Sequence, residues 1–258
     1  MKKCKHNISE NELKSLPYKV TFINERGYKK NVSFKRIASM KEFDKGVKKY
    51  LETIDYVPDI IYVPVPSIRL GLYAKNYCKK HNTKLLIDIE DLWPESFRML
   101  LKSTLLTKVC FFPQLIQANK LYKVSDGIIA VSDTFLNRAL SVRKDIPPHE
   151  VVYIGSDFEL AKKEIAINRE IRKPQDEFWV IYIGTLGKSY DIKRCIDVFI
   201  DLFKHGHNNI KLKVLGSGPD EKMLKEYVKV NECNVEFLGL LPYSEMINYI
   251  NISDIALN

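Results

Sequence analysis

The sequence predicts an α/β protein with two parallel-sheet domains. Short apolar runs rich in β-branched and aromatic residues alternate along the chain with segments of helical periodicity. Strands that alternate with helices pair in parallel through right-handed crossovers. A charged stretch at 155–177 interrupts this alternation, which then resumes. We therefore expect an amino-terminal domain over residues 1–155, a linker over 156–177 and a carboxyl-terminal domain over 178–258.

The first half contains four apolar runs of strand composition with helices expected around them. Before residue 33 only a short piece at 18–23 looks like a strand. A helix is expected over 33–50, and Ser67 is a candidate cap for the next one. Pro94 suits the first position of a third helix, and Ser132 suits the cap of a fourth. The expected strands lie at 59–63, 84–89, 127–131 and 151–154.

The second half repeats the alternation. Residues 179–183 form an unbroken apolar run, as expected for a strand buried on both faces. From Ile192 onward the apolar residues share one face of a helix. Pro219 and the acidic residues after it open a further helix, and Ser244 is a candidate cap of a short one. The remaining expected strands lie at 210–215, 235–238 and 254–257.

Composition narrows the class of partner and the compartment. The 258-residue chain has a net charge of +9, which favours an anionic partner such as a phosphorylated substrate or an acidic membrane surface. A nucleic-acid partner is not expected, because the aromatic residues lie in strand runs and form no RNA-recognition motif. Five scattered cysteines without a CxxC pair indicate buried thiols in a reducing cytosol. No apolar run is long enough to cross a bilayer, and no signal peptide is recognised, so a cytoplasmic location is expected.

Two glycine-rich turns follow successive strands of the second half. They read GTLGK at 184–188 and GSGPD at 216–220. Ligands of open parallel sheets bind outside the carboxyl ends of the strands, where turn N–H groups and helix amino termini suit a phosphate. The turns are neither a Walker loop nor a dinucleotide fingerprint, since GxxxxGK[ST] does not occur and GTLGKS lacks a third glycine at the required offset. Tight turns that bind nothing are the alternative.

Longer stretches carry a resemblance to a known family. The carboxyl-terminal half resembles the donor domain of a family 4 (group 1) glycosyltransferase, through WVIYIGTLGKSYDI, KLKVLGSGPDEKML, NVEFLGLLPYSEMINYI and SDIALN. The first half is similar to the acceptor domain of the subset with a DLWPES signature, through KLLIDIEDLWPES and SDGIIAVSDTF. The resemblance implies a GT-B-like fold with two Rossmann-type domains facing a cleft. It also implies transfer of a sugar from a nucleotide-diphosphate donor with retention of configuration.

The resemblance also assigns donor-binding residues. The first turn would line the donor diphosphate, the second would close the other side of the pocket, and two leucines after Gly239 would lie near the base. No cofactor and no metal site is implied, and His205 and His207 lack a third ligand at metal spacing. The implied donor-binding residues are Gly184, Thr185, Gly187, Lys188, Gly216, Ser217, Gly218, Pro219, Leu240 and Leu241.

Catalytic residues are expected in an acidic cluster after the strand at 84–89. The cluster comprises Asp88, Glu90, Asp91 and Glu95. Glu90 or Asp91 could orient the acceptor hydroxyl or accept its proton. Capping of the next helix by Asp91 and Glu95, with the others solvated, is the alternative. Relatives often place a histidine near Glu90, and the departure from that pattern leaves both readings open.

Parts of the family pattern do not occur in the chain. The donor-binding Glu-x7-Glu segment would follow SDIALN, and the family's first strand and glycine loop would precede residue 33. Both domains are therefore expected to be incomplete, with weak or no activity for the chain alone. A non-catalytic partner subunit, an inactive gene fragment, or a second chain supplying the carboxyl-terminal part are alternatives. A nucleotide-sugar 2-epimerase is the enzyme alternative, although DLWPES and GTLGKSYD favour the transferase.

The expected acceptor is a glycan or a polyprenyl-linked sugar in cell-surface polysaccharide synthesis, by analogy with the family. Residues 96–125 combine basic and apolar side chains without an acidic residue. Such a segment could rest on an anionic membrane, at the inner face of the plasma membrane. Ordinary core helices with solvated lysines are the alternative. The basic residues are Arg98, Lys102, Lys108, Lys120 and Lys123.

Overall fold

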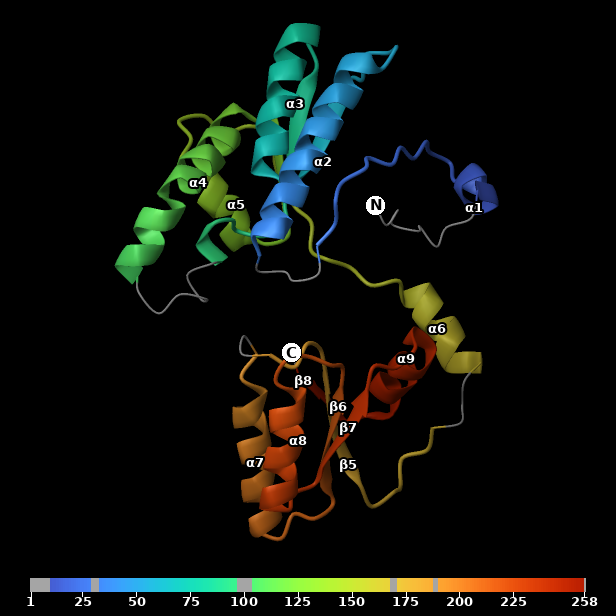
Figure 1. Ribbon diagram of the computed structural model, residues 1–258. Coiled ribbons are helices and arrows are strands. Elements are labelled where there is room, and N and C mark those ends of the chain that lie inside the picture. The colour runs from blue at the N-terminus through green and yellow to red at the C-terminus, as the bar shows by residue number, and fades with distance from the viewer. Residues whose placement is uncertain (1–9, 29–32, 97–103, 168–170, 188–189, 258) are drawn as a thin grey trace. The chain divides into compact units, whose positions relative to one another are not determined.

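The computed structural model describes residues 10–28, 33–96, 104–167, 171–187 and 190–257 (Figure 1). The chain divides into two compact units, Met1–Ile154 and Gly155–Asn258, which are described separately. Each unit is built on a parallel sheet of four strands, which confirms the expected α/β class.

The first sheet has the strand order β1-β2-β3-β4. Its strands are β1 (Ile60–Val65), β2 (Lys84–Ile89), β3 (Gly127–Ala130) and β4 (His149–Val151). The fourth strand was expected at 151–154 and lies earlier. After Val151 the chain leaves the sheet, and the three apolar residues that suggested a strand there are between 53% and 82% exposed. Their composition reflects an exposed connecting segment rather than a buried strand.

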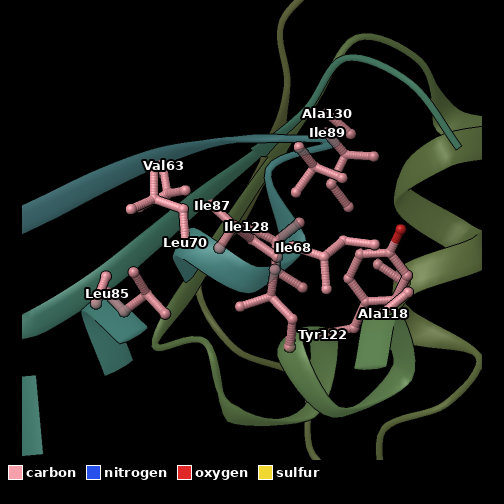
Figure 2. Close-up of a cluster of buried hydrophobic side chains, with 14 of the residues drawn as sticks. Val63, Ile68, Leu70, Leu85, Ile87, Ile89, Ala118, Tyr122, Ile128 and Ala130 are labelled. Carbon is pink, nitrogen blue, oxygen red and sulfur yellow. The ribbon is translucent and has the colours of Figure 1, made fainter. Parts of the chain in front are cut away.

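Topology decides which face of this sheet is covered. Each strand is followed by a helix and then by the next strand of the sheet, so the chain always moves toward the same edge of the sheet. The connecting helices are α3 (Ile68–His81), α4 (Thr104–Val124) and α5 (Asp133–Leu140). Right-handed crossovers then place all three helices on one face. Figure 2 shows the core beneath them, where alternate strand residues meet the helices. The fully buried members of the core are Val65, Leu85, Ile87, Ile89, Ala118, Leu121, Tyr122, Ile128, Ala130 and Ala139.

Two further helices precede β1. Helix α2 (Phe34–Thr53) begins where expected, because the Ser33 side chain accepts a hydrogen bond from the backbone N–H of Arg36. It packs against α3 rather than on the sheet. Helix α1 (Glu10–Ser15) is short, and residues 19–28 contain no strand, unlike the strand-like piece expected at 18–23.

The second sheet has the order β7-β6-β5-β8. Its strands are β5 (Phe178–Ile183), β6 (Ile210–Leu215), β7 (Val235–Gly239) and β8 (Ile255–Leu257). The order runs outward from β5 to β7 and then returns to the other side of β5. By the same handedness rule, α7 (Ile192–Lys204) and α8 (Glu221–Asn231) cover one face, while α9 (Tyr243–Ile252) lies on the other.

Helix α6 (Phe158–Ile167) lies in the segment expected to be a linker, residues 156–177. It packs against α9, and the Asn248 side-chain amide donates to the backbone carbonyl of Glu164 over 3.3 Å. The segment therefore contributes a helix to the second unit.

The apolar face expected from Ile192 onward is confirmed in α7. Four of its residues are buried against β5 and β6, where they meet Leu212 and Val214. This burial holds the start of the helix, and the turn before it, at the edge of the sheet. The buried residues of the helix are Ile192, Ile196, Phe199 and Ile200.

A largely buried ion pair, Lys75–Asp126, is expected to make the stability of the first unit depend on pH. Asp126 accepts hydrogen bonds from Lys75 Nζ at 2.7 Å and from the Leu85 backbone N–H at 2.8 Å. Burial alone would raise the pKa of Asp126, but these hydrogen bonds, together with the positive charges of Lys75 and Lys84, outweigh it and lower the pKa. A carboxyl group with a depressed folded-state pKa stabilises the fold above its unfolded pKa, about 3.9, and loses this stabilisation as the pH falls through the folded value.

We therefore expect Asp126→Asn to destabilise the protein at neutral pH and to flatten its loss of stability in acid. The measurement is urea denaturation followed by Trp93 fluorescence at neutral pH and at about pH 3. Equal acid sensitivity of the variant and the wild type would show that Asp126 carries no pH-dependent stabilisation.

Candidate donor and acceptor sites

The two glycine turns of the second unit interlock at the carboxyl edge of its sheet. Because β5 and β6 are parallel neighbours, their ends meet there. The Gly184 N–H donates to the Leu215 carbonyl at 3.0 Å, and the Leu186 N–H donates to the Ser217 carbonyl at 3.0 Å. The Asp220 N–H returns a bond to the Leu186 carbonyl at 3.0 Å. The turns therefore form one unit, which is hereafter called the paired turns (residues 184–187 and 216–220).

Two positions in the paired turns require glycine. Gly216 has φ +127°, and a Cβ there would lie 1.9 Å from the carbonyl oxygen of Gly184. A Cβ on Gly218 would lie 2.2 Å from the carbonyl oxygen of Leu186. Both contacts are with backbone atoms that cannot move aside without breaking the interlock. The glycines thus allow two strand ends to approach within backbone contact.

A buried leucine holds the first turn against the core of the second unit. Leu186 is fully buried in the core formed by β5, β6 and α7, and the Tyr182 hydroxyl donates to the Thr185 carbonyl at 3.1 Å. A leucine between two glycines gave no sequence signal for this role, because its burial depends on the pairing of β5 with β6.

Three backbone N–H groups of the paired turns remain available for a ligand. Within the described part of the chain, the N–H groups of Thr185, Ser217 and Gly218 donate to no protein acceptor. They lie beside the amino terminus of α8, whose dipole is positive at that end. An anion held there would receive several preorganised hydrogen bonds without rearrangement of the turns.

The other implied donor residues lie around this edge. The Gly216 N–H donates to the Gly239 carbonyl at 2.7 Å, which brings the turn after β7 beside the paired turns. Leu240 in that turn is 77% exposed and Leu241 is partly exposed, while Pro219 is exposed at the start of α8. Lys188 lies outside the described residues.

Two acidic side chains near the paired turns lie close to basic neighbours. Asp191 occupies the N-cap position of α7 but makes no capping hydrogen bond, and its carboxylate lies 3.6 Å from Arg194 Nε. Glu221 pairs with Lys225 at 2.7 Å in the first turn of α8. These pairs reduce the repulsion that an anionic ligand would meet.

The four carboxylates of the acidic cluster in the first unit have four different environments. Asp88 is buried and accepts a hydrogen bond from the Tyr62 hydroxyl, which raises the pKa of Tyr62 to about 12. Glu95 pairs with Arg138, and Asp91 accepts a hydrogen bond from the Ser96 hydroxyl at 2.9 Å. Glu90 is exposed at the end of β2, and its N–H donates to the Val65 carbonyl at 3.3 Å.

A 3₁₀ turn begins at Glu95, directly after Pro94, where the sequence predicted the start of a helix. Trp93 and Pro94 lie in a turn, and α4 is described from Thr104. Asp91 and Glu95 therefore do not cap α4 among the described residues. Glu95 accepts a hydrogen bond from Arg138 of α5, which also donates to Asn119 of α4. Sequence spacing gave no sign of these contacts. No group of three metal-ligating side chains occurs among the described residues.

Comparison with known proteins shows what the second unit resembles. Residues 163–257 match the family profile of glycosyl transferases group 1. The match spans nearly all of that unit, including the paired turns. The second unit is therefore similar to a group 1 glycosyltransferase domain.

The glycosyltransferase relationship extends to both units. An uncharacterized glycosyltransferase of Methanocaldococcus jannaschii is 27% identical over 193 residues, which is 72% of this chain and 46% of that protein. Sucrose-phosphate synthase from Thermosynechococcus elongatus matches 84% of this chain and 54% of its own, with 16% identity and a TM-score of 0.57. Anabaena HepE in complex with UDP matches 86% and 57%, with 14% identity and a TM-score of 0.56. The fold is therefore that of GT-B glycosyltransferases.

The chain spans about half the length of these relatives. Among the described residues, no helix combines the length and the apolar character needed to cross a membrane.

Proposed function

We propose that the protein is a retaining glycosyltransferase that takes a sugar from a uridine diphosphate donor. The acceptor is a glycan or polyprenyl-linked sugar in the synthesis of a cell-surface polysaccharide. The observation that carries the proposal is the pair of interlocked glycine turns, with three available N–H groups, in a unit that is similar to a group 1 glycosyltransferase domain. The choice of uridine is supported by structures of similar fold that contain UDP or UDP-glucose.

The proposed chemistry matches the electrostatics of the paired turns. In sugar transfer, negative charge builds on the departing diphosphate in the transition state. Preorganised N–H groups and a helix amino terminus stabilise such charge without reorganisation. By the family resemblance Lys188 adds a positive charge there, and each charge-assisted hydrogen bond contributes roughly 1.5–3 kcal/mol. Leu240 and Leu241 would contact the base.

On the acceptor side we assign the catalytic carboxylate to Glu90 rather than to Asp91. The Asp91 carboxylate already accepts the Ser96 hydroxyl, whereas Glu90 is exposed at the carboxyl end of β2. A carboxylate in that position can orient the acceptor hydroxyl and accept its proton.

Calorimetric titration of UDP-, GDP- and ADP-sugars tests the donor assignment. We expect heat of binding with UDP-sugars. Gly187→Ala should weaken binding about tenfold with little change in stability. The added Cβ would make only ordinary contacts, the nearest with Pro219 Cγ at 3.8 Å, and would narrow the approach to the turns. Gly155→Ala, where a Cβ meets nothing within 4 Å, is the matched control. Absence of binding by all three nucleotide sugars would refute the proposal.

A surface of α4 supports an acceptor on a membrane. Phe112 and Ile116 are 58% and 52% exposed, and the exposed Lys120 and Lys123 continue the same face toward the end of the helix. An apolar stripe with adjoining lysines suits the headgroup region of an anionic bilayer.

We expect the protein to sediment with vesicles that contain anionic lipid and to remain in the supernatant with neutral vesicles. Phe112→Ser with Ile116→Ser should abolish sedimentation, because the stripe loses its apolar area. Val198→Ser, at an exposed position of α7 in the other unit, is the control. Equal sedimentation with both vesicle types would remove the membrane part of the proposal.

A further inference from the structure

Residues 90–96, hereafter the acidic loop, connect β2 to the segment before α4 and carry Glu90. Leu92 and Trp93 pack against the core of the first unit. The Ser96 N–H donates to the Leu92 carbonyl at 2.8 Å, and its hydroxyl contacts Asp91. These contacts hold the loop against the core of the first unit. They are apolar packing contacts and hydrogen bonds within the loop itself, which restrain the loop less directionally than a salt bridge to a neighbouring helix would.

One polar anchor does connect the acidic loop to two helices. Arg138 of α5 donates from Nε to Glu95 Oε1 at 2.6 Å and from its terminal nitrogen to Asn119 Oδ1 of α4 at 2.7 Å. Its guanidinium lies 5.5 Å from the centre of the Tyr122 ring. The side chains of Arg138 and Glu95 are only 20% and 19% exposed.

The geometry of this anchor restricts its movement. The planar guanidinium presents its donors in a fixed fork, so binding Glu95 and Asn119 together fixes its orientation. The ring of Tyr122, which is fully buried in the core, supports the guanidinium. Low exposure strengthens the electrostatic attraction between the two charges. A carboxylate held in this way fixes the loop that carries it, five residues from Glu90.

We propose that the Glu95–Arg138 ion pair positions the acidic loop, so that Arg138 acts through Glu95 on the placement of Glu90. Arg138 is thus a positioning residue and not a ligand of the substrate. The importance of Glu90 rests on the proposed function, whereas the mechanical role of the ion pair does not.

The two tryptophans of the chain provide a direct test. Trp93 lies in the acidic loop and Trp179 lies in the second unit. In the full chain labelled with 5-fluorotryptophan, each gives one fluorine NMR resonance. Glu95→Gln, which keeps the size of the side chain and removes its charge, should shift or broaden the Trp93 resonance and leave Trp179 unchanged. Arg138→Ala should do the same, and Arg138→Lys should give a smaller change.

Variants of a second ion pair in the same unit show whether an effect on Trp93 comes from positioning of the loop or from a general loss of stability. Lys75 and Asp126 are also largely buried, but they bond at the beginning of β2. Lys75→Met should lower the stability of the first unit without moving the Trp93 resonance. The proposal is overturned if Glu95→Gln leaves Trp93 unchanged, or if Lys75→Met shifts it as much as Glu95→Gln does.

Transfer kinetics then connect the loop to the reaction. Glu95→Gln should lower kcat about 10²-fold, because a small misplacement of a catalytic group has effects of this order. Donor affinity should stay unchanged, since the paired turns are in the other unit. A shifted Trp93 resonance with unchanged kcat would overturn the link to Glu90. A wild-type protein that binds no nucleotide sugar would refute the proposed function, while the fluorine spectra would still decide the role of the ion pair.

Discussion

Replacing Gly216 with alanine should destabilise the second unit by about 3 kcal/mol or more and abolish donor binding. The new Cβ would lie 1.9 Å from the Gly184 carbonyl oxygen, at a φ of +127° that side chains rarely adopt. Relief of this contact requires the two strand ends to separate, which breaks the hydrogen bonds between the paired turns. Urea denaturation followed by Trp179 fluorescence measures the stability, and calorimetry measures the binding.

Gly206→Ala is the matched control for this prediction. Gly206 also has a positive φ, +84°, but a Cβ there would meet nothing within 4 Å. It should therefore cost only the conformational strain, about 1–2 kcal/mol, and leave donor binding intact. If both variants were equally destabilised, the close approach of the turns would not be what Gly216 provides.

Replacing Arg143 with methionine should destabilise the first unit by about 2–4 kcal/mol. The Arg143 side chain is only 4% exposed, and it donates to the Tyr122 and Ser125 carbonyls at the carboxyl end of α4, the latter at 3.1 Å. A helix end leaves such carbonyls unsatisfied. The Ser125 hydroxyl also donates to the Tyr122 carbonyl at 3.1 Å, so the main cost of the substitution is the loss of the donor to the Ser125 carbonyl. Denaturation followed by Trp93 fluorescence measures the loss.

The control for Arg143 is its acidic partner. Asp145 bonds to Arg143 at 2.8 Å but is 72% exposed, so solvent screens the interaction. Asp145→Asn should leave the denaturation midpoint unchanged. A wild-type midpoint for Arg143→Met would show that the carbonyls at the end of α4 find other donors.

Much of the fold could be predicted because its strands are short, apolar and separated by turn residues. The strand at 210–215 was predicted to the residue, and the apolar stripe of α7 indicated its buried face. The errors have physical causes. The exposed apolar residues after Val151 imitate a strand, and the charges of residues 155–177 conceal α6, whose packing partner α9 lies about 80 residues later.

The donor side of the site was easier to predict than the acceptor side. The glycine turns are local sequence features, and the parallel pairing of β5 with β6 was enough to bring them together. The acidic cluster was read as one group, but Asp88 pairs with Tyr62 and Glu95 with Arg138, 26 and 43 residues away. Such distant partners are set by strand register and helix packing, which one sequence does not reveal.

The central claim is that the paired turns hold the diphosphate of the donor through their backbone. An amide-resolved NMR titration of the full chain with UDP tests it most directly. We expect the backbone N–H signals of Thr185, Ser217 and Gly218 to shift together and to saturate with one affinity. UDP that binds while these three signals stay in place, with shifts elsewhere in the chain, would contradict it.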